Sequence, residues 1–132
     1  GAGSAVAKAL PSLAGKLTSN AIRVPVPNGS LVVLNLEVEK ETSLEEVNSI
    51  MKKYALEGNL VEQIRYSLNN ELVSSDIVGS AQPSIYDSNA TIVSPDGKSI
   101  VMYVWYDNEY GYSHQVIRLA KYIAKVRRYT YY

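Results

Sequence analysis

Residues 99–132 constrain the fold most, because their pattern is typical of a strand that leads directly into a helix. Large apolar and aromatic side chains occupy both alternating faces of residues 100–105, which indicates an interior strand covered on two sides. After Tyr106 the period changes from 2 to about 3.6. One helix face then carries Tyr112, Val116, Leu119, Ala120 and Ile123. Since backbone N–H groups gather where a helix begins, we expect a ligand-binding corner between the two elements.

Composition excludes several classes of protein. The chain has 132 residues, 46% of them hydrophobic, which is enough to bury the core of one domain. It has no cysteine and one histidine, His114, so it cannot supply a disulfide, a thiolate nucleophile or a multi-histidine metal centre. Thirteen basic and thirteen acidic residues give zero formal charge, which argues against nucleic acid or an anionic membrane as a partner. No membrane span or secretory signal is recognisable, so we expect a cytoplasmic location.

Helical spacing predicts two further helices before this stretch. The first is rich in alanine and covers residues 1–13, where Pro11 should kink or end it. The second begins after Ser43, because Ser43 and Glu46 have the spacing of a capping box. Its apolar side chains should face a sheet, and Gly58 should close it.

Residues 20–26 and 31–40 are expected to be two strands of an antiparallel hairpin, because Pro27-Asn28-Gly29 between them is a turn signal. Arg23 would lie on the strand face opposite the aliphatic side chains. Two interpretations of Arg23 stay open at this point. It is either a solvated arginine at a strand end or a guanidinium group that binds a phosphate through two parallel hydrogen bonds.

Three more strands are expected, at residues 64–68, 89–93 and 99–106, the last two joined by a turn at 94–98. Ser74-Ser75-Asp76 has no histidine near it to activate a serine, so we interpret it as a turn that satisfies the backbone. These patterns predict an α+β fold. It consists of a largely antiparallel (mixed) sheet with about three helices, the last of them packed along the sheet.

Asn108 is the candidate functional residue of the corner. Its side chain could cap the helix that follows, although Asp107 could do the same. Alternatively, the Asn108 amide is a donor and acceptor that matches another carboxamide. Residue type alone does not decide between these interpretations.

Three stretches carry a resemblance to a known family: RVPVPNGS at residues 23–30, ELVSSDIVG at residues 71–79, and WYDNEYGYSHQVIRLA at residues 105–120. In this order they closely resemble the C-terminal part of the catalytic domain of phosphorylating glyceraldehyde-3-phosphate dehydrogenase. The resemblance covers essentially all of residues 1–132. It implies that the nucleotide-binding domain and the segments with the catalytic cysteine and histidine are absent from this chain.

The resemblance implies a glycolytic oxidoreductase that oxidises and phosphorylates glyceraldehyde 3-phosphate to 1,3-bisphosphoglycerate. NAD is the cofactor that it implies, with NADP as the alternative. In this chemistry a cysteine thiolate attacks the aldehyde, hydride transfer leaves a thioester, and inorganic phosphate cleaves the thioester. Because the chain has no cysteine, we expect it to be inactive alone. The implied partners are the missing nucleotide-binding half and, in a tetramer, further copies.

The resemblance also implies roles for four residues. Arg23 would bind the substrate phosphate, and Gly1 would help to bind a phosphate of the substrate or of the attacking inorganic phosphate. Asn108 would orient the nicotinamide carboxamide, and Tyr112 would lie beside the nicotinamide ring. His114 does not match the family's catalytic histidine, so we expect no catalytic residue and no metal ligand in this chain. Two alternatives remain: a sister dehydrogenase for another sugar phosphate aldehyde such as erythrose 4-phosphate, and a non-catalytic binding or assembly domain of the same fold.

Overall fold

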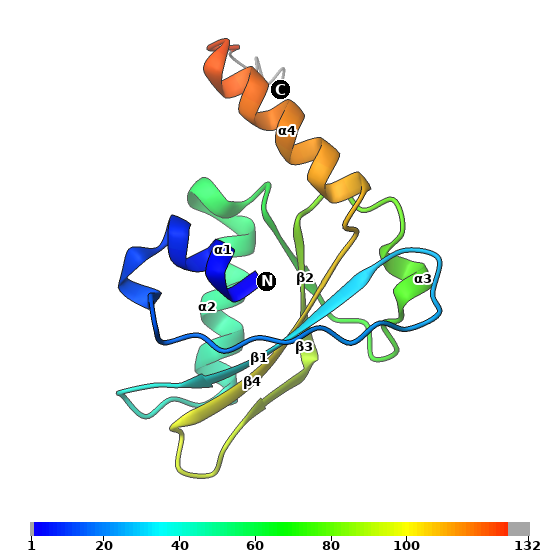
Figure 1. The fold of residues 1–132 in the computed structure, drawn as a ribbon. Coiled ribbons are helices and arrows are strands. Elements are labelled where there is room, and N and C mark those ends of the chain that lie inside the picture. Colours follow the sequence, from blue (N-terminus) through cyan, green and yellow to red (C-terminus); the bar gives the residue numbers. More distant parts are fainter. Residues whose placement is uncertain (1, 127–132) are drawn as a thin grey trace.

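The structure is a computed structural model that describes residues 2–126, with side chains from residue 5 onward. The described residues form a sheet with helices on its surface and at its end (Figure 1). The helices are α1 (Ala2–Ala9), α2 (Leu44–Leu56), α3 (Ser74–Ile77) and α4 (Tyr110–Ile123). The strands are β1 (Ser30–Glu37), β2 (Ile64–Ser67), β3 (Ser84–Val93) and β4 (Ser99–Tyr106). Two short 3₁₀ turns, η1 (Pro11–Leu13) and η2 (Gly58–Leu60), follow α1 and α2.

The four strands form one mixed sheet in the order β1-β4-β3-β2. Strand β4 is antiparallel to both β1 and β3, whereas β2 is parallel to β3. The predicted hairpin turn at residues 94–98 joins β3 to β4, and β4 lies inside the sheet as expected. The predicted α+β class with a largely antiparallel sheet is therefore confirmed.

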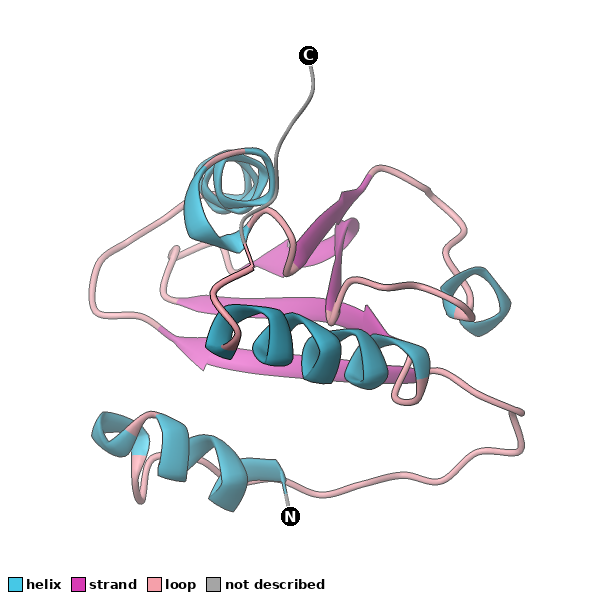
Figure 2. Cartoon of the chain, turned by 90° about the horizontal axis from the view of Figure 1, so that it is seen from above, coloured by secondary structure: helices cyan, strands magenta, loops and turns pink. Residues whose placement is uncertain are grey.

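Helix α2 covers one face of the sheet, and the core lies beneath it (Figure 2). Val47 from α2 packs with Tyr86, Ile100 and Met102 in a buried cluster. The hydroxyl of Tyr86 donates to Asn48 Oδ1 at 2.7 Å, so the only polar atom of this buried ring has a partner. Ser43 caps the helix as predicted, because its side chain accepts from the N–H of Glu46 at 3.2 Å.

The opposite face of the sheet is only partly covered by the described residues. On this face Leu31 of β1 pairs with Trp105 of β4, and Val33 pairs with Tyr103. Leu31 is 39% exposed and Val33 is 45% exposed. In β4 itself, Ile100 and Met102 beneath α2 are buried, whereas Val101, Tyr103 and Trp105 on the opposite face are only partly buried. The prediction of cover on both sides of β4 therefore holds only in part. An alternating pattern shows that both strand faces are apolar, but it does not show what packs on each.

The predicted hairpin of residues 20–26 and 31–40 is wrong. Residues 17–29 contain no helix or strand, and β1 pairs with β4 along its whole length. Pro25 and Pro27 have no N–H to donate to a neighbouring strand, so this segment is a poor partner in a sheet.

Helix α4 follows β4 after a three-residue turn and extends beyond the end of the sheet (Figure 1). Its predicted apolar face is exposed, with Tyr112 at 71%, Val116 at 50%, Leu119 at 57% and Ile123 at 70%. The last helix thus follows the sheet, but within the described residues α4 does not pack along the sheet. Helical periodicity predicts an apolar face, but it does not predict what covers that face. Among residues 2–126, no helix combines the length and the apolar character that a membrane span requires.

Candidate functional site

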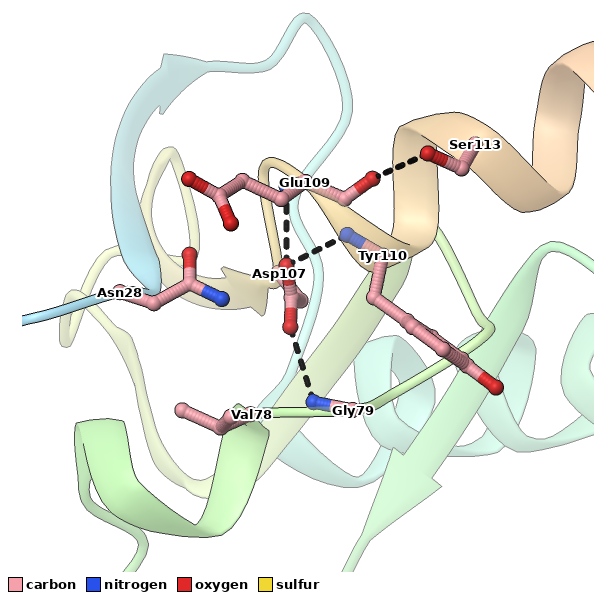
Figure 3. A pocket seen from close by; sticks show the side chains of 7 residues that line it. All are labelled: Asn28, Val78, Gly79, Asp107, Glu109, Tyr110 and Ser113. Carbon is pink, nitrogen blue, oxygen red and sulfur yellow. Dashed lines mark hydrogen bonds between the residues drawn. The ribbon is translucent and has the colours of Figure 1, made fainter.

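Asp107 is the central residue of the corner between β4 and α4. Its side chain is 2% exposed, and both carboxylate oxygens accept hydrogen bonds from backbone N–H groups (Figure 3). Oδ1 accepts from Glu109 at 2.8 Å and from Tyr110 at 2.7 Å. Oδ2 accepts from Gly79 at 2.8 Å. One carboxylate therefore ties the end of the sheet to the start of α4 and to the loop between α3 and β3.

The hydrogen bonds to Asp107 also keep it ionised. Burial alone would raise the pKa of the Asp107 carboxyl group. Together, the surrounding donors outweigh the effect of burial and lower the pKa to about 2. These donors are the N–H groups of Gly79 and Tyr110, the Asn28 side chain and the N–H of Glu109. At neutral pH the corner thus contains a buried negative charge at the N-terminal end of α4, where the helix dipole favours it.

We expected free backbone N–H groups at this corner to bind a ligand, but the structure shows that two of these groups already have a partner. The N–H groups of Glu109 and Tyr110 already donate to Asp107, so the chain supplies its own anion at this helix end. Asp107 also settles the capping question, because it satisfies the first turn of α4 in place of Asn108. The amide of Asn108 is therefore free for another role.

Asn108 lies exposed on this turn and contacts the neighbouring strand. The hydroxyl of Ser30 donates to Asn108 Oδ1 at 3.2 Å. Ser30 is the first residue of β1 and pairs with Tyr106, the last residue of β4. The oxygen end of the Asn108 amide is thus bonded to β1, which orients the side chain relative to the sheet.

A surface cavity of about 320 Å³ opens beside Asp107. It is lined by Asn28, Val78, Gly79, Asp107, Glu109, Tyr110 and Ser113 (Figure 3). Asn28 comes from the RVPVPNGS stretch, Val78 and Gly79 from the ELVSSDIVG stretch, and the other four from the strand–turn–helix stretch. The three stretches that carry the resemblance therefore meet in space, although they are far apart in the sequence.

None of the predicted site residues that the structure describes lines this cavity. Arg23 is exposed in the segment without secondary structure, and Tyr112 is exposed on the first turn of α4. Neither residue lines the cavity, and neither does Asn108. Gly1 lies outside the described residues. His114 lines a second groove of about 570 Å³, beside the ion pair of Arg118 and Glu62.

Sequence reasoning missed the parts that Ser30 and Gly79 have in the corner, and it treated Asp107 only as a possible cap. The available signal was their position, since all three lie inside the stretches that resemble the family. Within the described part of the chain, no group of three or more His, Cys, Asp or Glu side chains is placed to hold a metal ion.

Comparison with known proteins identifies the class. Residues 1–108 match the family model described as the C-terminal domain of glyceraldehyde 3-phosphate dehydrogenase. The match includes β1, β4 and the turn as far as Asn108. The chain belongs to this family, as the resemblance predicted.

Individual relatives show the same similarity over a longer range. The glyceraldehyde-3-phosphate dehydrogenase of Geobacillus stearothermophilus is 51% identical over 124 residues, which are 94% of this chain and 36% of that protein. A glyceraldehyde-3-phosphate dehydrogenase-like protein of Pseudomonas aeruginosa (strain UCBPP-PA14) is 49% identical over 96% of this chain and 27% of that protein. Glyceraldehyde-3-phosphate dehydrogenase 3 of Saccharomyces cerevisiae is 44% identical over 95% of this chain and 37% of that protein. The chain thus spans about a third of the length of these curated relatives.

Proposed function

We propose that the chain is the C-terminal part of the catalytic domain of a phosphorylating glyceraldehyde-3-phosphate dehydrogenase. The complete enzyme would convert glyceraldehyde 3-phosphate and inorganic phosphate to 1,3-bisphosphoglycerate. The observation that carries this proposal is the meeting of the three family stretches around Asp107. The alternatives, a dehydrogenase for erythrose 4-phosphate and a non-catalytic domain, have no comparable support.

In this proposal the chain supplies binding groups. Arg23 binds the phosphate of the substrate, since a guanidinium group can donate two parallel hydrogen bonds to phosphate oxygens. Gly1 belongs to a second phosphate contact. The thiolate that attacks the aldehyde comes from another part of the complete polypeptide, because the chain has no cysteine. The chain by itself is therefore inactive.

The residues of the corner fit a nicotinamide cofactor, which accepts the hydride when it is bound. Asn108 is exposed, its amide does not cap α4, and its oxygen end is fixed by Ser30. An amide held in this way can pair with the carboxamide of the cofactor. Tyr112, on the turn of α4 that follows, offers an exposed aromatic ring to the nicotinamide. We propose NAD as the cofactor, with NADP as the alternative.

The proposal extends to assembly and location. The exposed Leu31 and Val33 on the open sheet face would be covered by a second copy in a homotetramer. A glycolytic role also places the enzyme in the cytoplasm. Sedimentation of the complete enzyme as a monomer, or fractionation of the enzyme with membranes, would contradict these two statements.

Replacement of Arg23 tests the phosphate-binding role in the complete polypeptide. We expect Arg23→Ala to raise the KM for glyceraldehyde 3-phosphate by about ten- to a hundred-fold, because the charged hydrogen bonds of the guanidinium group to the phosphate are lost. Turnover of unphosphorylated glyceraldehyde should change little, because that aldehyde has no phosphate to bind. Steady-state kinetics with both aldehydes measure this difference.

Arg65→Ala is the matched control, since Arg65 is an exposed arginine on β2 outside the cavity. We expect it to leave the KM for both aldehydes unchanged. Equal changes for the two aldehydes in Arg23→Ala, or no change, would remove Arg23 from the substrate site.

A further inference from the structure

The contact between Ser30 and Asn108 gives the amide a defined orientation. An asparagine amide has an acceptor at one end and two donors at the other, so its rotation decides what it can bind. An exposed side chain on a turn would otherwise populate several rotamers, and fixing it on binding would cost free energy. The bond from the Ser30 hydroxyl to Asn108 Oδ1, 3.2 Å long, favours the orientation in which the oxygen end faces Ser30. It uses the oxygen end and leaves the NH₂ end turned away from Ser30.

Ser30 is itself well placed by the chain around it. It begins β1 and pairs with Tyr106, so its backbone is fixed relative to β4. Before it, Gly29 adopts a φ of +99°, and the N–H of Gly29 donates to Asn28 Oδ1 at 2.7 Å. A Cβ atom at Gly29 would approach the backbone oxygen of Ser74 to 3.4 Å. The turn before β1 is therefore in contact with α3, which helps to fix the backbone that carries the Ser30 side chain.

The backbone of Asn108 is fixed independently of its side chain. Asp107 precedes it and accepts from the N–H of Glu109, which follows it. Asp107 also accepts from Gly79, which anchors the turn to the loop after α3. Asn108 thus has two supports: Asp107 holds its backbone, and Ser30 holds its amide.

We propose that Ser30 is a positioning residue that acts through Asn108, turning the donor end of the Asn108 amide toward the carboxamide of the nicotinamide cofactor. This inference rests on the cofactor role proposed above for Asn108. It assigns to Ser30 no contact with cofactor or substrate. The hydrogen bond from Ser30 restricts the rotation of the Asn108 side chain before the cofactor binds, so that less entropy is lost on binding.

A double-mutant cycle in the complete polypeptide tests this proposal. The variants are Ser30→Ala, Asn108→Ala and the combination, assayed with glyceraldehyde 3-phosphate and with NAD or NADP, whichever the enzyme turns over faster. We expect Ser30→Ala to lower kcat/KM for the cofactor by about three- to ten-fold, which corresponds to the free energy of one neutral hydrogen bond. The KM for the aldehyde should stay unchanged. Because Ser30 acts through Asn108, the double variant should be no worse than Asn108→Ala alone.

Two further variants separate positioning from a general loss of structure. Ser30→Thr keeps the hydroxyl and should restore most of the cofactor kcat/KM. Ser94→Ala removes a hydroxyl from the turn at the other end of β4 and should leave that kcat/KM unchanged.

The outcomes distinguish this inference from the proposed function. If Asn108→Ala impairs use of the cofactor but Ser30→Ala does not, the positioning role is overturned and the proposed function stands. A Ser30→Ala defect that persists in the Asn108→Ala background also overturns it. If Asn108→Ala itself leaves use of the cofactor unchanged, the cofactor role of Asn108 fails, and the inference fails with it.

Discussion

Replacing Asp107 by asparagine keeps the size of the side chain but removes its charge, so it tests what the carboxylate contributes. The wild-type carboxylate accepts from three backbone N–H groups in a buried position. An asparagine there would present an NH₂ group to one of these donors. We expect Asp107→Asn in the complete polypeptide to lower the free energy of unfolding at pH 7 by about 2 kcal/mol, measured by urea denaturation. Asp96→Asn, in an exposed turn, is the control and should cost less.

The pH dependence of this difference follows from the pKa of Asp107. The folded-state pKa is about 2, below the ordinary value of 3.8, so the folded chain binds the proton less readily than the unfolded chain does. The stabilisation is therefore present above about pH 4 and is lost as the pH falls toward 2. The gap in stability between wild type and Asp107→Asn should shrink over this range. A gap that stays constant from pH 7 to pH 2 would contradict the ionised role of Asp107.

At the residue scale, the sequence predicted the position of the corner better than the roles within it. Asp107 and Asn108 are adjacent and are both common capping residues, so residue type could not show which of them caps α4. Burial decides, because Asp107 is enclosed and can reach three N–H groups, whereas Asn108 is exposed. The role of Ser30 depends on the pairing of β1 with β4, which no local pattern reveals.

At the element scale, the turn between β3 and β4 meets the loop before α2 at Gly97. The N–H of Thr42 donates to the oxygen of Gly97 at 3.0 Å, and a Cβ atom at Gly97 would lie only 2.7 Å from the oxygen of Thr42. Gly58 has a similar positive φ, +81° against +67° for Gly97, but open space around it. The two glycines thus differ mainly in the space around them.

We expect Gly97→Ala to lower the free energy of unfolding by about 1–3 kcal/mol more than Gly58→Ala, because both substitutions strain φ but only the first adds a steric clash. Urea denaturation of the two variants of the complete polypeptide measures the difference. Equal losses would show that the turn and the loop before α2 are not packed as the structure has them.

Local signals predicted elements well, and non-local pairing was harder to predict. The capping residue Ser43 and the turn at residues 94–98 depend on neighbours in the sequence, and both were predicted correctly. The hairpin of residues 20–40 was wrong because β1 takes its partner from β4, near the other end of the chain. The apolar face of α4 was predicted, but the described residues do not cover it.

At the scale of the whole molecule, the described residues supply a corner and a sheet, and the sequence contains no cysteine. Its family is clear from the match over residues 1–108, and it spans about a third of its curated relatives. The sequence predicted the α+β class and this family. It could not predict how Arg23 lies relative to Asn108, because the two residues are far apart in the sequence and their spacing depends on tertiary packing.

The most direct measurement is the initial rate of cofactor reduction by the complete polypeptide with glyceraldehyde 3-phosphate, with and without inorganic phosphate. We expect reduction of NAD with sustained turnover only when phosphate is present, and 1,3-bisphosphoglycerate as the product, because phosphate is needed to release the acyl group from the enzyme. No cofactor reduction, turnover that does not depend on phosphate, or a higher kcat/KM for erythrose 4-phosphate would contradict the proposed function.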